Sequence, residues 1–290
     1  MDDRALDLGT LQSLLDRVRG QTIACVGDVM LDRYVYGDVS RISPEGPIPV
    51  LKMGRAVSMP GGVGNVARNV AALGGQARLG AMAGDDPAGH ELSGLVRAEE
   101  RIADFIDRPD GVRTTVKTRF VSGGQQLLRL DEEEVAAGVF ERDDVFSGAS
   151  AILLSDYAKG VVTERLIRSA LWAAQSSRAP VIVDPKGRDF ARYGAVDVIK
   201  PNASELAGAT GLPVDTDAEI EAALAAALEA TTAKAIVVTR AGKGMSLARR
   251  GGGVSHFPGR AREVFDVSGA GDTGLAALGL ALGAGASLEQ

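Results

Sequence analysis

The sequence predicts an α/β protein whose mainly parallel central sheet is flanked by helices and carries a small lid of β-strands. Three observations support this fold class. Short apolar runs recur along the 290 residues, stretches with helical periodicity lie between several of them, and two extended segments fit neither pattern. Strands that alternate with helices in this way build βαβ units and a parallel sheet.

The apolar runs are short and continuous, which is typical of buried parallel strands. They comprise Ile23–Val26, Ala151–Leu154, Val181–Val183, Val196–Ile199 and Ala235–Val238. The helical stretches include Leu11–Val18, Glu164–Gln175 and Ala218–Ala230. Ligands of such sheets bind at the carboxyl ends of the strands. The polar residues that follow the runs are therefore site candidates: Asp28, Asp156, Asp184, Lys186, Lys200, Asn202, Thr239 and Arg240.

Two segments, at approximately residues 34–59 and 114–130, are predicted to form the lid. The first carries Pro44, Pro47 and Pro49 among β-branched residues, which is typical of edge strands because proline cannot donate to a strand ladder. The second alternates polar and apolar residues from Thr115 onward. The acidic run Asp131–Glu134 is most simply a solvated turn.

Composition and charge argue against several classes of protein. The net charge of −6 and the pI of about 5.1 disfavour a general nucleic-acid surface, which is basic. One cysteine, Cys25, allows no intrachain disulfide, and two histidines disfavour a zinc site. The acidic N-terminus predicts no signal peptide, and no apolar run reaches the ~18 residues of a membrane span. We therefore expect a cytoplasmic protein with residues 1–290 in one domain.

The strongest local signal is the run Asp266–Thr273, which precedes a small, apolar stretch at Gly274–Leu282 that predicts a helix. The turn Gly269-Ala270-Gly271 at the start of a helix offers backbone N–H groups to phosphate oxygens. An acidic residue beside such a turn would repel an anion, unless it serves as a base for a hydroxyl that attacks phosphorus. We therefore interpret Asp272 as a candidate base, and its alternative role is a helix N-cap.

A second glycine-rich run, Pro60–Val70, predicts a turn followed by a helix that ends at Gly74-Gly75. Gly61, Gly62 and Asn65 could meet sugar hydroxyls there. The same run fits a dinucleotide-binding pattern, but that pattern should follow a strand, and Met59-Pro60 precedes it here. The segment Gly242-Lys243-Gly244 lacks the spacing of a phosphate-binding Walker loop and predicts a hairpin turn.

In their order along the chain, these motifs resemble the two signature regions of the PfkB/ribokinase sugar kinases. The resemblance spans Ile23–Gln290 and implies a ribokinase-like fold. Within that family, several runs resemble the kinases of D-glycero-β-D-manno-heptose 7-phosphate, which act in ADP-heptose and lipopolysaccharide core synthesis. These runs are Val26–Tyr34, Ser40–Glu45, Ser155–Gly160 and Asp184–Gly187.

The resemblance implies ATP-dependent phosphorylation of the sugar at O1, with Mg²⁺ as the accompanying ion. Asp272 would be the base, and Gly269, Ala270 and Gly271 the anion hole. The remaining roles follow by matching positions. The residues that would hold the sugar are Asp28, Asp32, Gly61, Gly62 and Asn65. Those that would hold ATP are Asn202, Glu205, Thr239, Arg240 and Gly242. Glu205 would also bind Mg²⁺ through a water molecule.

A substrate that already carries a phosphate calls for cations. The candidates for binding this phosphate, chosen from their neighbours in the sequence, are Arg33, Arg41, Lys159 and Lys186. Gln125, Gln126 and Arg129 on the predicted lid could also reach the sugar. Gly274 departs from the family, which has a hydrophobic residue there, and should loosen the start of its helix. The resemblance also implies further residues beyond Gln290, an adenylyltransferase domain fused there, and a homodimer that forms through lid edges.

Three other functions remain open at this stage. Another PfkB-type kinase would act on ribose, a hexose phosphate or a nucleoside. A non-catalytic nucleotide or sugar sensor could keep the fold, although it would not need a base such as Asp272. A dinucleotide oxidoreductase would require NAD binding.

Overall fold

The structure is a computed structural model that describes residues 8–259 and 269–290. Its larger sheet has nine strands in the order β13-β12-β11-β10-β9-β8-β1-β4-β5. The strands are β1 (Thr22–Gly27), β4 (Gln76–Met82), β5 (Ile102–Asp107), β8 (Ala151–Ser155), β9 (Val181–Asp184), β10 (Val198–Ile199), β11 (Ala235–Thr239), β12 (Met245–Arg249) and β13 (Val254–Phe257). All neighbours from β11 to β5 are parallel, and β12 and β13 are antiparallel. The predicted mainly parallel sheet is confirmed.

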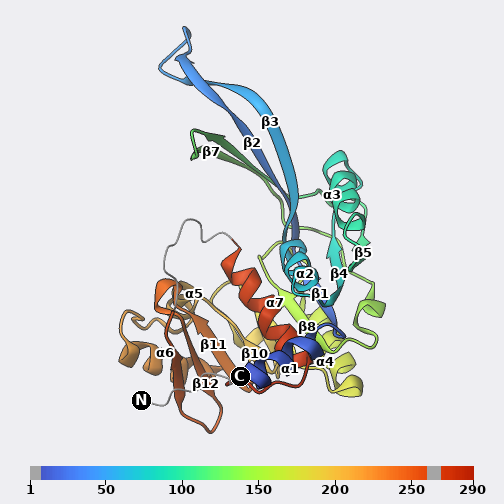
Figure 1. Cartoon of the computed structure of the whole chain (residues 1–290), viewed down its shortest axis with the longest axis vertical. Coiled ribbons are helices and arrows are strands. Elements are labelled where there is room, and N and C mark those ends of the chain that lie inside the picture. Colours follow the sequence, from blue (N-terminus) through green and yellow to red (C-terminus); the bar gives the residue numbers. More distant parts are fainter. Residues whose placement is uncertain (1–7, 260–268) are drawn as a thin grey trace.

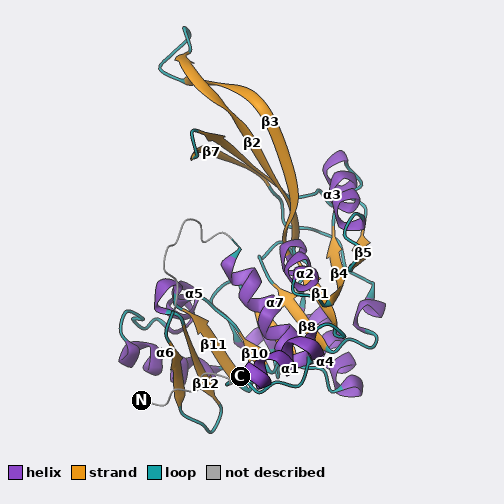
Figure 2. Cartoon of the chain, viewed as in Figure 1, coloured by secondary structure: helices purple, strands orange, loops and turns teal. Residues whose placement is uncertain are grey.

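Helices cover both faces of this sheet (Figures 1 and 2). Strand β1 shows why, because its side chains alternate between two apolar clusters. Ile23 and Cys25 pack with α1 (Leu8–Val18), α2 (Val63–Ala72), α3 (Pro87–Arg97) and α7 (Ala270–Gly283). Ala24 and Val26 pack with α4 (Glu164–Ser177), α5 (Ala203–Thr210) and α6 (Asp217–Ala230). Each of the described helices is too short or too polar to cross a membrane.

A second, four-stranded sheet has the order β3-β2-β6-β7 and forms the lid that the sequence predicts. It consists of β2 (Val29–Ile42), β3 (Pro49–Gly62), β6 (Val116–Ser122) and β7 (Gln125–Glu132). In Figure 1 it projects away from the body of the molecule. The proline-rich strand β3 lies at an edge, as expected, whereas β2 is an inner strand paired on both sides.

Three sequence predictions differ from the structure in this region and at α7. The acidic run Asp131–Glu134 is not simply a turn, because β7 continues to Glu132 and pairs with β6. The glycine-rich run at Gly61 does follow a strand, because β3 extends through Pro60 to Gly62. That strand is the edge of the lid, however, and not part of a parallel βαβ unit. Helix α7 begins at Ala270, four residues before the predicted stretch, and Gly274 lies inside it.

Candidate functional site

A cavity of roughly 220 Å³ lies at the carboxyl ends of β8, β9, β10 and β11, beside the first turn of α7. Parallel strands present their carboxyl ends at one edge, so residues far apart in sequence meet there. Six of the twelve lining residues are among the strand-end candidates that the sequence predicts. The lining consists of Asp156, Tyr157, Asp184, Pro185, Lys186, Lys200, Asn202, Glu205, Thr239, Gly269, Gly271 and Asp272.

Asp272 lies in the first turn of α7 and is only 6% exposed. The N-cap of this helix is Gly269, so the alternative of Asp272 as an N-cap is wrong. Its carboxylate accepts hydrogen bonds from Asn65 Nδ2 at 2.7 Å and from the Tyr157 hydroxyl at 3.1 Å. Burial raises the pKa of Asp272, and these two donors oppose the rise because they stabilise the charged form.

The turn before Asp272 brings backbone close to the site. Gly269 has a φ of 77°, and a Cβ there would lie 2.7 Å from Asn65 Nδ2, so a side chain would disturb the group that holds Asp272. Ala270 and Gly271 follow as the first two helical residues, and the N–H groups of a first turn have no acceptor within their helix. The preceding residues Asp266–Ser268 of the motif lie outside the described residues.

A buried ion pair stands beside this turn. Lys200 Nζ lies 2.9 Å from Asp184 Oδ2, and the Lys200 side chain is 3% exposed. A Cβ on Gly271 would be 3.8 Å from Lys200 Nζ, which places the ammonium next to the start of α7. Burial raises the pKa of Asp184 to about 6, although the Lys200 charge acts in the opposite direction. The Lys200 ammonium therefore lies at the N-terminus of α7, and Asp184 balances its charge.

Asn202 and Glu205 form a capping box at the start of α5. Asn202 Oδ1 accepts from the backbone N–H of Glu205 at 2.8 Å, and Glu205 Oε2 accepts from that of Asn202 at 3.0 Å. Glu205 Oε1 also lies 3.3 Å from Lys186 Nζ. All three residues line the cavity. The N-x-x-E run thus has a structural role here, and Glu205 also presents its carboxylate to the site with the Lys186 ammonium beside it.

Thr239, Arg240 and Gly242, which were expected to contact ATP at the end of β11, do not all face the cavity. Thr239 lines the cavity. The Arg240 side chain is buried on the other side, where it binds Asp217 at 2.6 Å and donates to Ser246 Oγ at 3.2 Å. Gly242 lies in the turn between β11 and β12, which confirms the predicted hairpin and leaves it outside the cavity lining. Sequence order alone could not reveal that neighbouring side chains point apart.

Asp28, expected to hold sugar hydroxyls, is 1% exposed and lies under the loop that follows β8. Its carboxylate accepts from the backbone N–H groups of Tyr157 at 2.7 Å, Lys159 at 3.0 Å and Val161 at 3.0 Å. Burial raises its pKa, and these three donors counteract the effect. The structure therefore gives Asp28 a role in shaping this loop, because its oxygens already have partners and no solvent access.

The base of the lid separates Asp32 from Arg33, because successive residues of a strand point to opposite faces. Asp32 binds Arg119 at 2.5 Å and packs so closely on Gly61 that a Cβ there would overlap its carboxylate. Arg33 binds Glu91 of α3 at 2.6 Å, on the other face. Gly62 is the N-cap of α2. The structure thus brings Asp32 and Gly61 together but directs Arg33 away from them.

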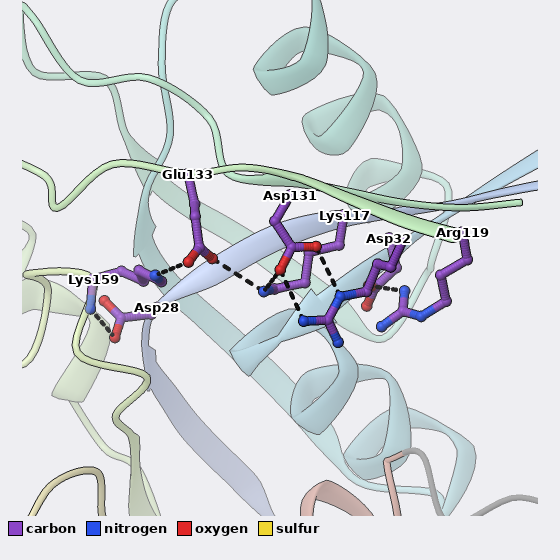
Figure 3. A network of polar contacts seen from close by, with 8 residues as sticks. Asp28, Asp32, Lys117, Arg119, Asp131, Glu133 and Lys159 are labelled. Carbon is purple, nitrogen blue, oxygen red and sulfur yellow. Dashed lines mark hydrogen bonds and ion pairs between the residues drawn. The ribbon is translucent and has the colours of Figure 1, made fainter. Parts of the chain in front are cut away.

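A row of ion pairs connects the lid to the loop after β8 (Figure 3). Lys159 Nζ lies 2.8 Å from Glu133, which also contacts Lys117 Nζ at 3.1 Å. Lys117 in turn contacts Asp131 at 3.2 Å, and Asp131 binds Arg129 at 2.9 Å. Lys159 is therefore engaged with a lid carboxylate. Gln125 lies at the turn of the β6–β7 hairpin, distant along the strands from this row.

Residues 21–290 match the description "pfkB family carbohydrate kinase". The chain belongs to this family. Its similar curated relatives include two proteins named bifunctional protein HldE. That of Hyphomonas neptunium is 51% identical over 97% of this chain and 59% of its own length, and that of Gluconacetobacter diazotrophicus is 50% identical over 93% and 57%. This carbohydrate kinase chain thus spans somewhat more than half the length of these relatives.

Solved structures of the same fold include two kinases. Ribokinase of Arabidopsis thaliana, complexed with ribose and ATP, aligns with a TM-score of 0.72 at 22% identity, covering 93% of this chain and 88% of that one. Phosphofructokinase-2 of Escherichia coli, in complex with fructose-6-phosphate, aligns at 0.68 and 25% identity with the same coverage. The ribokinase-like fold predicted from the sequence is confirmed.

Sequence reasoning missed several groups around the site. Tyr157 was noted only within a resembling run, although its hydroxyl contacts Asp272. Lys117 and Arg119 were overlooked as lid cations, and Asp131 and Glu133 were placed in a solvated turn. The alternation of charged residues along β6 was an available signal, because it places Lys117 and Arg119 on the same face as Asp32.

Proposed function

We propose that this chain transfers the γ-phosphoryl group of ATP to O1 of D-glycero-β-D-manno-heptose 7-phosphate and forms the 1,7-bisphosphate. The observation that carries the proposal is the buried carboxylate of Asp272. It is held by Asn65 and Tyr157 at the positive end of α7, in a cavity beside the lid. The resemblance of the runs at Val26–Tyr34 and Ser155–Gly160 to heptose 7-phosphate kinases supports this choice of substrate.

In the proposed reaction, Asp272 accepts the proton of the sugar hydroxyl while that oxygen attacks the γ-phosphorus. A new oxygen–phosphorus bond forms as the bond to the ADP oxygen breaks. The backbone N–H groups at Gly269–Gly271 stabilise charge on the transferring group, and Lys200 adds a cation nearby. Closure of the lid excludes water, which limits hydrolysis of ATP.

In this proposal ATP lies over Asn202, Glu205 and Thr239, and Lys186, which also lines the cavity, would bind a phosphate. The oxygen donors of Glu205, Asp184 and Asn202 suit Mg²⁺. Among the described residues, no group of three acidic, histidine or cysteine side chains is arranged to bind a metal, which fits an ion held largely by phosphates and water. When bound, Mg²⁺ neutralises phosphate charge. Asp32, Gly61, Gly62 and Asn65 are placed around the sugar.

Three broader features belong to the same proposal. The unpaired sides of β3 and β7, with exposed Met53 on β3 and Leu128 on β7, support a homodimer formed through the lid. Light scattering at micromolar concentration should report twice the chain mass. The name of the relatives supports a fused second activity, for which we propose an adenylyltransferase. We place the enzyme in the cytoplasm, where ATP is available.

The deciding experiment measures ADP release with Mg-ATP and four acceptors in parallel: the heptose 7-phosphate (β anomer), ribose, fructose 6-phosphate and adenosine. Turnover with the heptose phosphate alone supports the proposal. Turnover with another acceptor keeps the kinase family and replaces the substrate. Binding of ATP without turnover on any acceptor would favour a sensor.

A further inference from the structure

Tyr157 has no place in the mechanism above except as a neighbour of Asp272. It follows β8 directly after Asp156, and its hydroxyl donates to Asp272 Oδ1 at 3.1 Å, while Asn65 donates to Oδ2 at 2.7 Å. Each oxygen of the carboxylate therefore has one neutral donor. Burial, followed by the negative charge of Asp272, raises the pKa of Tyr157 well above its ordinary value. The phenol stays protonated and can act only as a donor toward this carboxylate.

The loop that carries Tyr157 is fixed from below by Asp28. Three backbone N–H groups of this loop donate to the buried Asp28 carboxylate, and that of Tyr157 is the closest at 2.7 Å. Hydrogen bonds to an ionised acceptor are about twice as strong as neutral ones. The two residues that make this connection, Asp28 and Tyr157, are 129 positions apart in the chain.

The same loop is also held from its other side. Asp156 accepts from the backbone N–H of Ala158 at 2.7 Å, and its second oxygen binds Arg192 at 2.6 Å and the Tyr193 hydroxyl at 2.8 Å. Ala158 has a φ of 57°, a left-handed conformation that a non-glycine residue keeps only when its surroundings impose it. The loop is thus built to hold one conformation, and that conformation delivers the Tyr157 hydroxyl to Asp272.

We propose that Tyr157 is a positioning residue for Asp272, and that Asp28 acts on the reaction through it by fixing the loop. This inference rests on the proposed function, in which Asp272 is the base. A carboxylate with one donor on each oxygen cannot rotate freely, so its remaining lone pairs keep a fixed direction toward the acceptor hydroxyl. Neutral donors suit this task, because a direct ion pair would weaken the base more strongly.

The charged and titratable groups that face Asp272 come from several elements. Lys200 after β10 lowers the pKa of Asp272 through space, whereas Asp32 on β2 raises it, and Asp184, the last residue of β9, lies beside Lys200. Tyr157 stabilises the ionised carboxylate, so loss of its hydroxyl should raise the pKa of Asp272 further. A base must be ionised to accept a proton. The acidic limb of kcat against pH should therefore move to higher pH when Tyr157 loses its hydroxyl.

The test is Tyr157→Phe, which keeps the ring and removes only the donor. We expect kcat near pH 6 to fall about tenfold with little change in the KM for the sugar phosphate, and the acidic limb to move up by about one pH unit. That is the size expected for losing one hydrogen bond to a charged group. Activity should recover partly at high pH, which a purely structural defect would not allow.

The matched control is Tyr36→Phe, since it also removes one tyrosine hydroxyl but lies on β2 of the lid, away from Asp272 and from the loop after β8. It should leave the position of the acidic limb unchanged. Asp28→Asn is a second variant, at a residue that contacts the Tyr157 backbone but not Asp272, and it should move the limb in the same direction by a smaller amount.

An NMR titration of the Asp272 carboxyl in Asp-labelled protein, without nucleotide, reads the same shift independently of turnover. If the wild type is active and neither Tyr157→Phe nor Asp28→Asn moves the limb or the titration, the positioning role is overturned. If the wild type phosphorylates none of the acceptors, the proposed function fails first. The NMR titration then decides whether Tyr157 controls the carboxylate all the same.

Discussion

The body and the lid of this kinase use ionic contacts in opposite ways. In the body, strands such as β8 are buried along their whole length, and the Lys200–Asp184 pair lies at their carboxyl ends with the Lys200 side chain only 3% exposed. In the lid, β7 is exposed at nearly every residue, and its Asp131 belongs to a row of partly exposed ion pairs with Lys117 and Glu133 (Figure 3). Burial fixes groups where the chemistry is proposed, whereas the more exposed ion pairs of the lid cost less to separate.

The largest effect should follow from breaking the buried pair. Lys200→Met leaves the Asp184 carboxylate without its partner, and breaking such a pair from one side costs about 3–5 kcal/mol. Urea unfolding should show this loss. The control is Lys234→Met, since Lys234 Nζ binds Asp197 at 2.6 Å but is 74% exposed, and its loss should cost at most about 1 kcal/mol. Equal losses for the two variants would contradict the distinction between buried and open pairs.

The next effect should appear in activity alone. Asp272→Asn keeps the shape of the side chain, and its amide can still bond to Asn65 and Tyr157, because a hydroxyl also accepts. We expect kcat to fall at least ~10²-fold, the usual share of a positioned base, with an unchanged melting temperature. Asp144→Asn, at an exposed pair with Arg142, serves as the control. A variant at position 272 with near-normal turnover would remove Asp272 from its proposed role.

The smallest effect should come from the lid. Glu133→Gln removes the carboxylate shared by Lys117 and Lys159, and such open pairs contribute about 0.2–1 kcal/mol. Hydrogen bonds from these lysines lower the pKa of Glu133, so its stabilisation is present at neutral pH and is lost as acid protonates it. The difference in urea midpoint from wild type should vanish in about 1 M salt. A difference that persists there would show that the lid row is not open to solvent.

The sequence was sufficient for the pattern of strands and the edge at which they deliver polar residues. Asp184, Lys200, Asn202 and Thr239 meet at one cavity because parallel strands all end on the same side. It was not sufficient for the direction of single side chains. Arg240 turns inward beside Thr239, where the buried hydroxyl of Ser246 accepts its hydrogen bond and the exposed carboxylate of Asp217 pairs with it. Such choices depend on contacts between distant segments, which no local pattern encodes.

The roles within the candidate site show the same limit. The base at Asp272 could be proposed because a carboxylate after Gly-Ala-Gly is chemically unusual. Asp28 also looked like a ligand for the sugar, yet it binds three N–H groups of a loop that lies far along the chain. A carboxylate at a strand end has the same local signature whether it faces a cavity, as Asp184 does, or supports a loop, as Asp28 does. Only the tertiary structure shows which of the two it does.

Strand β1, at the centre of the large sheet, contains the chain's single cysteine. Cys25 is fully buried between β8 and β4, and burial raises the pKa of its thiol. Thiol reagents attack the thiolate, so the folded state should resist them. Modification can therefore proceed only as fast as the middle of the sheet opens. The rate at which a disulfide reagent labels the unaltered protein thus measures that opening directly, one event per molecule.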